Sequence, residues 1–238
     1  MSKTTYLLIT IFSAVFFGSC NKQGTDSVIS GEPAVWGKLS AIVEDRKIIS
    51  GADTLFEHYE IGRAEFLQHP DVPGIFSDAG DISINGIMLD RDLNNSYSKI
   101  VTELGIPDSL RWHVTGTSAI PNLSLRDTAD FPLYTGPVPF EISKSAGYSI
   151  LLDSTTLSRA DSVRILIDDG GSNRVFRTYS ARSGMIMISP ADLSVLNTVT
   201  DQTGFIGIYP YGGEVRVTRG KGYFYSRESR IHQSININ

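Results

Sequence analysis

Hydrophobic and polar residues alternate in short segments along most of the chain, which is the pattern of half-buried β-strands. Residues 110–114 are the clearest example, because Leu110, Trp112 and Val114 fall on one face and the polar residues between them on the other. Trp36–Val43 is the first segment of this kind. We therefore expect a chain built mainly of strands.

Turn signals separate these segments. Asn85-Gly86 accepts the two positive φ angles of a type I′ turn, so it predicts a hairpin. Asp168–Gly171 predicts a further turn, and Ser189 followed by Pro190 fits the N-cap and first position of a short helix. The strands predicted in the second half of the chain are Tyr148–Leu152, Ser162–Ile167, Arg174–Tyr179, Gly184–Ile188, Phe205–Tyr211, Tyr223–Tyr225 and Arg230–Ile237.

One segment has helical rather than strand periodicity. The apolar residues of Ser96–Leu104 recur at helical spacing, and Gly105 follows as a helix-ending residue. A helix is therefore the competing interpretation of this segment, beside the short helix that begins after Ser189.

The density of short strands predicts an all-β, immunoglobulin-like β-sandwich, arranged as two packed sandwich domains. Four of the ten prolines lie between residues 121 and 139, where they indicate an extended crossing segment. This segment gives the predicted boundary between an N-terminal β domain, residues 33–125, and a C-terminal immunoglobulin-like sandwich, residues 126–238.

The first residues of the chain predict a targeting signal rather than an element of the fold. Lys3 is followed by the apolar segment Tyr6–Phe17, which is too short to span a hydrocarbon core of about 30 Å. The small residues Gly18 and Ser19 then precede Cys20, the one cysteine of the chain. We expect a signal peptide over residues 1–19 and a flexible tether over residues 20–32.

This N-terminus resembles a bacterial lipoprotein signal, in which small residues precede the modified cysteine. The resemblance implies acylation of the Cys20 sulfur, cleavage before Cys20 and acylation of the new amine. A membrane partner through this lipid anchor follows from it. Asn21 rather than aspartate follows the cysteine, so by the same resemblance the destination is the outer membrane, with the periplasmic or surface-facing side left open.

The mature chain is similar to small Bacteroidota lipoproteins in Arg111–Gly116, Phe131–Pro139 and Ala160–Val163. This resemblance brings no activity with it. Six triplets of aspartate, serine or threonine, and a small or aliphatic residue resemble the O-glycosylation triplets of exported Bacteroidota proteins, while turn formation before strands explains them equally well. They begin at Asp26, Asp53, Asp108, Asp127, Asp153 and Asp161.

Charge excludes one class of partner. The formal net charge is −5, and removal of residues 1–19 takes away Lys3 and no acid, which leaves −6. Nucleic-acid recognition needs a basic stripe that neutralises phosphates, so nucleic acid is not an expected partner.

The residues with catalytic chemistry form no recognisable motif. The sequence contains no Gly-x-Ser-x-Gly element and no phosphate-binding loop, and its four histidines have no metal-ligand spacing. His113 and His232 occupy polar positions of alternating strands, so we expect both to face solvent. Asp90–Asn94 begins like a calcium loop but lacks its later ligands, and an Asx-rich turn is the better interpretation. We expect no catalytic residue, cofactor or metal.

Four tyrosines are the candidate binding residues. Tyr209 and Tyr211 share one strand face, as do Tyr223 and Tyr225, and if the two faces adjoin the rings form a platform on which sugars could stack. Ordinary cross-strand packing is the alternative. The sequence thus predicts a non-enzymatic, lipid-anchored envelope protein with a binding or scaffold role and a glycan or envelope protein as partner. A glycan-binding lipoprotein of a polysaccharide-uptake system is the first alternative, and a fimbrial or adhesin subunit the second.

Overall fold

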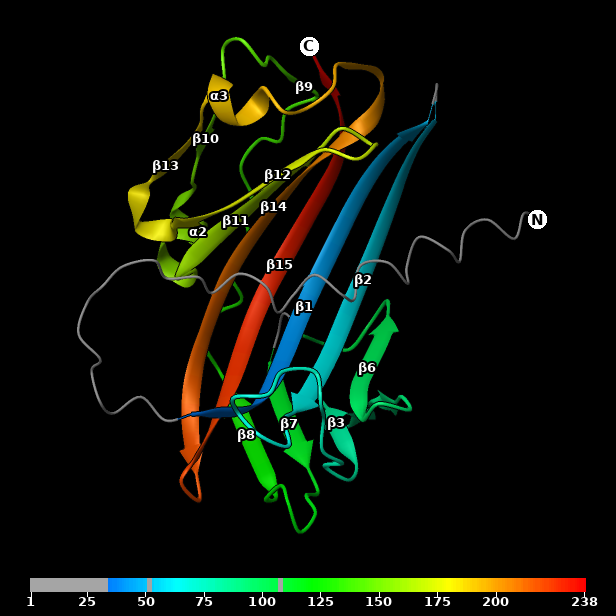
Figure 1. Ribbon diagram of the computed structural model, residues 1–238, viewed down its shortest axis with the longest axis vertical. Coiled ribbons are helices and arrows are strands. Elements are labelled where there is room, and N and C mark those ends of the chain that lie inside the picture. The colour runs from blue at the N-terminus through cyan, green and yellow to red at the C-terminus, as the bar shows by residue number, and fades with distance from the viewer. Residues whose placement is uncertain (1–33, 51–52, 107–108) are drawn as a thin grey trace.

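Figure 1 presents the computed structural model of the chain, which describes residues 34–50, 53–106 and 109–238. Over these residues the protein is all-β, as predicted, with three short helical segments. The strands are β1 (Val35–Ser50), β2 (Asp53–Phe66), β3 (Ile82–Ile84), β4 (Ile87–Met88), β5 (Asp90–Arg91), β6 (Ser96–Val101), β7 (Leu110–Val114), β8 (Leu123–Asp127), β9 (Glu141–Ile142), β10 (Tyr148–Leu151), β11 (Ser162–Asp168), β12 (Arg174–Ser180), β13 (Met185–Ile188), β14 (Val199–Thr218) and β15 (Lys221–Ile237). The helical segments are α2 (Ser154–Arg159), η2 (Ala181–Ser183) and α3 (Pro190–Leu193).

One large sheet organises the molecule. Its order is β12-β11-β14-β15-β1-β2-β6-β5, and β9 pairs in addition with the end of β15. Neighbours on this path are antiparallel except β1 and β15, which run parallel. The four central strands β14, β15, β1 and β2 are long and extend through most of the molecule (Figure 1).

Two smaller sheets cover the ends of one face of the large sheet. The sheet β4-β3-β7-β8 closes the first hydrophobic core, and the pair β10-β13 closes the second. β15 contributes Tyr223 and Tyr225 to the first core and Ile235 and Ile237 to the second. All four are odd-numbered positions of one strand and therefore point to the same side. We call this side the covered face.

The other side of the large sheet we call the open face. Ile42, Ile61 and Leu166 point to it and are buried, yet they belong to neither of the two cores that the described residues form. Ile42 pairs with Ile61 and with Glu228, and Leu166 pairs with Phe176 and Gly207.

The proline-rich segment after β8 joins the two cores across the covered face of β15. Ser229 Oγ donates to the Pro132 carbonyl at 2.6 Å, and Gln233 Nε2 donates to the Pro139 carbonyl at 2.6 Å. The predicted domain boundary between residues 125 and 126 falls inside β8, and the two cores share the strand β15 within one continuous sheet.

Several local predictions are confirmed. Asn85 and Gly86 have φ angles of 49° and 83°, as a type I′ turn requires, and they connect β3 to β4. Trp112 is buried within β7, whereas His113 beside it is exposed. Ser189 Oγ accepts a hydrogen bond from the Asp192 amide and caps α3.

The competing helical interpretation of Ser96–Leu104 is wrong. These residues begin with β6, which pairs with residues 60–65 of β2 and with β5. Tyr97 and Leu104 belong to the first core and Val101 packs against it, whereas Ile100 is exposed. Cross-strand pairing therefore decides the backbone here, because tertiary context overrides a short helical period.

Three strand predictions were too short. Tyr223–Tyr225 and Arg230–Ile237 are parts of the single strand β15, and Phe205–Tyr211 is the middle of β14. The charged residues Glu228 and Arg230 interrupt the apolar pattern of β15, but they point to the open face and do not end the strand.

Candidate functional site

The four predicted tyrosines do not form one platform. Tyr223 and Tyr225 lie in the first core on the covered face, where Tyr223 has no exposed surface. Tyr211 pairs with Glu228, so it points to the open face, and Tyr209 points the same way two residues earlier. Burial raises the pKa of both Tyr211 and Tyr223 to about 12. The two strand faces are opposite sides of one sheet and do not adjoin, so the condition for a shared platform is not met. Cys20 lies outside the described residues.

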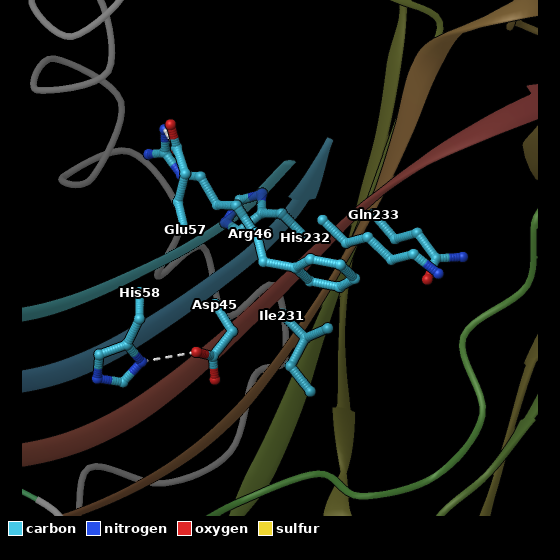
Figure 2. Close-up of a pocket in the computed structure, with 9 residues that line it drawn as sticks. Asp45, Arg46, Glu57, His58, Ile231, His232 and Gln233 are labelled. Carbon is cyan, nitrogen blue, oxygen red and sulfur yellow. Dashed lines mark hydrogen bonds and ion pairs between the residues drawn. The ribbon is translucent and has the colours of Figure 1, made fainter. Parts of the chain in front are cut away.

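A groove lies instead on the β1–β2 hairpin, between the two cores (Figure 2). It has a volume of about 360 Å³. The hairpin extends past the strands that close the first core, since β6 pairs only with residues 60–65 of β2. The groove is lined by Asp45, Arg46, Lys47, Phe56, Glu57, His58, Ile231, His232 and Gln233.

The register of the hairpin places an acid and a histidine together. Asp45 pairs with His58 across the two strands, and Asp45 Oδ1 lies 2.7 Å from His58 Nδ1 (Figure 2). This hydrogen bond raises the pKa of His58 above its ordinary value. The pair therefore offers a hydrogen-bonded carboxylate and an imidazole whose Nε2 lies beside the side chain of Glu60, at 3.8 Å from Oε1.

Exposed aromatic rings flank this pair. Lys47 pairs with Phe56, the next residue position along the same face, and Phe56 is 72% exposed. Phe140, at the end of the proline-rich segment, is 52% exposed, and Lys47 Nζ lies 4.3 Å from the centre of its ring and 5.9 Å from that of Phe56. The amine thus lies near two rings that solvent reaches.

The far wall of the groove is held in place by β15. Gln233 Nε2 donates to the carbonyl groups of Val138 and Pro139, at 3.2 and 2.6 Å, and the Asn236 amide donates to the Phe140 carbonyl at 2.9 Å. The backbone that carries the Phe140 ring is therefore fixed before any ligand arrives, which lowers the entropy that binding has to overcome.

Sequence reasoning missed this groove. Phe56 falls on the same face of β2 as Ala64 and Phe66, two core residues, so its position alone predicts burial. Phe56 is exposed because the smaller sheets on this face do not extend over it. The local sequence pattern around Phe56 carries no information about how far those sheets extend.

The open face at the same level carries a network of ion pairs. Glu44 is only 3% exposed and pairs with Arg46 and with Arg230, the latter at 3.5 Å. Glu228 accepts from Arg230 Nε at 2.8 Å and from Arg164 Nη2 at 3.0 Å. Burial opposes ionisation of both acids, but His232, Arg230 and Arg46 hold the pKa of Glu44 below its ordinary value, and Arg230 and Arg164 do so for Glu228.

His232 lies at the edge of this network. We expected it to face solvent, but it is half-buried and its ring centre lies 5.2 Å from that of Tyr209. Burial lowers the pKa of His232 to about 4, so the ring is neutral at pH 7. The described polar groups around it form no hydrogen bond with its Nε2.

The two predicted turns rich in acids are structural. Asp92 Oδ1 accepts from the amides of Asn94 and Ser96, each at 2.8 Å, which makes Asp90–Asn94 an Asx turn. Asp169 is buried and accepts from the Asn197 amide at 2.9 Å, and this bond, with others, lowers its pKa to about 2. Among residues 34–50, 53–106 and 109–238, no group of three or more histidine, cysteine, aspartate or glutamate side chains could hold a metal ion.

The aspartates of three of the six triplets accept hydrogen bonds from backbone amides. Asp153 Oδ1 accepts from the Thr156 amide and caps α2, and Asp127 Oδ1 accepts from the Ala129 amide. Turn and cap formation therefore accounts for the aspartate at these two positions. Asp161 Oδ2 instead accepts from the amide of Gly213, which is distant in the sequence.

Comparison with known proteins gives no relative: no protein-family model and no curated protein sequence matches the chain. Within the part of the chain that the structure describes, no helix is long and apolar enough to cross a membrane.

Proposed function

We propose that this chain is a lipid-anchored protein of the bacterial outer membrane that binds a ligand or partner in the hairpin groove and catalyses no reaction. The anchor rests on the sequence pattern that ends at Cys20. The binding role rests on one structural observation: Phe56 and Phe140 expose their rings on either side of Lys47, next to the Asp45–His58 pair.

This arrangement supports binding for a physical reason. Exposed phenyl rings on a fixed backbone lose little entropy when a partner covers them, and each burial of apolar surface is favourable. Asp45, His58 and Lys47 add donors and acceptors that fix the orientation of the partner.

A glycan is the candidate ligand that the groove favours among the alternatives. The faces of sugar rings carry C–H groups that pack on aromatic rings, while their hydroxyls need donors and acceptors at the rim. The groove supplies both, because the hairpin carries the Phe56 ring and the carboxylate–imidazole pair and the proline-rich segment places the Phe140 ring near Lys47.

Calorimetric titration of the purified protein with a panel of neutral and acidic oligosaccharides tests the glycan role. We expect at least one to bind, and Phe56→Ala or Phe140→Ala to weaken that binding about tenfold or more. Phe176→Ala is the matched control, because Phe176 is also exposed but lies on β12, outside the groove. Absence of binding by every oligosaccharide removes the glycan role.

A photo-crosslinking amino acid tests the groove without assuming a ligand class. Placed at position 56 in cells that make the protein, it should give a discrete adduct, and the same group at position 176 should not. Equal adducts at both positions, or none at either, contradict a binding role for the groove.

The anchor has its own test. Radiolabelled palmitate should label the wild type and fail to label Cys20→Ser. Labelling that persists in Cys20→Ser excludes acylation at this residue and with it the proposed address.

Two finer predictions remain proposals. An immunoglobulin-like relationship and a division into two domains fit the presence of two cores. A fimbrial role would need an exchangeable terminal strand, and β15 pairs on both sides, with β14 and β1, so we do not favour it.

A further inference from the structure

Two cations on the open face have no bonded partner. Lys38 and Arg63 are half-buried, on neighbouring strands of the large sheet. Neither makes a hydrogen bond or an ion pair within 4.0 Å with any residue in the described parts of the chain. A cation withdrawn from water without a partner is unfavourable, so its presence needs a physical reason.

The other cations of this face differ in this respect. Arg46, Arg164 and Arg230 all form ion pairs, and together they occupy the carboxylates of Glu44 and Glu228. The carboxylates of Glu44 and Glu228 thus pair with three arginines, and neither carboxylate pairs with Lys38 or Arg63.

Glu65 is the remaining acid in reach, since it pairs in register with Lys38. The two side chains do not approach within 4.0 Å, although each is half-buried. Burial raises the pKa of Glu65 and lowers the pKa values of Lys38 and Arg63, which means that each of the three groups is poorly stabilised in its charged form. An added anion would stabilise both cations.

Small polar residues lie beside the two cations. Ser40 follows Lys38 on the same face of β1 and pairs with Arg63 of β2, and its hydroxyl oxygen lies 2.9 Å from that of Ser226 on β15. Both serines are buried, and the Phe224 ring covers the next residue across the sheet, Gly213. The two cations therefore lie diagonally across β1 and β2, next to a pair of buried hydroxyl groups.

Aromatic rings border the same serines. Phe224 pairs in register with Lys38, and its ring centre lies 6.1 Å from that of Tyr211. Both side chains are half-buried and so keep some surface in contact with solvent. A ligand that places its negative group between Lys38 and Arg63 can lay an apolar face on Phe224.

We propose that Lys38 and Arg63, with the Ser40 and Ser226 hydroxyls, form a binding site for one oxyanion group, a carboxylate or a sulfate, carried on a sugar ring that packs against Phe224. The guanidinium of Arg63 matches the planar or tetrahedral oxygens with two donors, and Lys38 adds a point charge. The site lies on the open face, whereas Asp45, Lys47, Phe56 and His58 of the hairpin groove lie on the covered face, and it does not depend on the function proposed for that groove.

Calorimetric titration tests this site with three probes: sodium sulfate, an oligogalacturonate and a neutral oligosaccharide of equal length. We expect the oligogalacturonate to bind, sulfate to bind more weakly, and the neutral sugar not to bind at this site. Lys38→Met and Arg63→Met, which keep much of the aliphatic length, should each weaken binding of the acidic sugar at least tenfold. Lys99→Met is the control, because Lys99 already pairs with Asp90 at 3.0 Å.

Thermal unfolding gives a second readout that does not require a tight ligand. Without added anion, Lys38→Met and Arg63→Met should unfold at or above the wild-type temperature, because each removes an unpaired cation. Sulfate stabilises most proteins by exclusion from their surface, so the expected signal is a larger sulfate-induced rise in the wild type than in either variant. Equal rises in all three, or oligogalacturonate binding that neither variant weakens, would overturn the proposal, and sulfate binding without oligogalacturonate binding would overturn the sugar assignment.

Discussion

Two consecutive residues of β1, Glu44 and Asp45, are both acids and lie in opposite environments. Glu44 points to the open face, is 3% exposed and pairs with Arg46 and Arg230. Asp45 points to the groove side, keeps more than half of its side chain in solvent and has one partner, His58. The alternation of a single strand thus separates a closed ionic network from an accessible binding surface.

The histidines of the two sides repeat the contrast. Burial lowers the pKa of His232 on the open face to about 4, while the hydrogen bond to Asp45 raises the pKa of His58 in the groove. Polar groups that satisfy one another inside the protein support the fold, and those left in contact with solvent remain available to a ligand. We therefore assign stability to the network and binding to the groove.

Removal of one buried carboxylate charge should have the largest effect on the free energy of unfolding. Glu44→Gln leaves Arg230 and Arg46 short of a partner, and removal of one member of a buried ion pair destabilises a protein by about 3–5 kcal/mol. Urea denaturation of the purified protein should show this decrease in the free energy of unfolding. The matched control is Asp45→Asn, one residue away, which should change it by less than about 1 kcal/mol because exposed pairs contribute little. Equal effects of the two variants would contradict the contrast between the faces.

The second effect is a dependence of stability on pH. The pKa of His232 is about 4 in the folded protein, against an ordinary value of 6.5, so the unfolded chain binds more protons between these values. The contribution of His232 to the free energy of unfolding is fully present above pH 6.5. It decreases by about 3 kcal/mol at most as the pH falls towards 4. Urea denaturation across this range should show a shallower decrease in His232→Phe.

The acids of the network, Glu44 and Glu228, contribute to the pH dependence of stability at lower pH than His232 does. The pKa values of Glu44 and Glu228 lie below the ordinary 4.5, so their contribution is present above pH 4.5 and is lost below it. His232→Phe should leave the Glu228 part of that lower decrease in place and weaken the Glu44 part, because His232 also lowers the pKa of Glu44. An unchanged slope between pH 6.5 and 4.5 in His232→Phe would show that this histidine is not held neutral by the fold.

Much of this molecule could be predicted from local sequence, because local geometry determines it. The turn at Asn85-Gly86, the cap at Ser189 and the alternation around Trp112 each depend on a few neighbouring residues. The groove and the ionic network could not be predicted, because they depend on which strands pair and how far the covering sheets extend. Phe56 has the pattern of a core residue, and Glu228 has the pattern of a strand end.

The third prediction is that removing the Phe56 ring from the groove leaves the free energy of unfolding almost unchanged. Phe56→Ala should alter the free energy of unfolding by no more than about 0.5 kcal/mol, because its ring is largely exposed in the folded protein. Tyr223→Ala, which removes a ring from the first core, should decrease it by about 3–5 kcal/mol. A large loss in Phe56→Ala, measured by the same urea denaturation, would mean that the ring supports the fold and is not free for a partner.

The contrast between the two faces is tested most directly by the titration of the histidine side chains, which is also the smallest of the expected effects. Nuclear magnetic resonance can follow the imidazole nitrogens between about pH 3 and 9, a range that brackets the ordinary pKa near 6.5. His58→Gln and His232→Gln assign the two resonances. We predict that His232 titrates near pH 4 and His58 above pH 6.5. Titration of both histidines together near pH 6.5 would contradict a closed network on one face of β1 and an accessible site on the other.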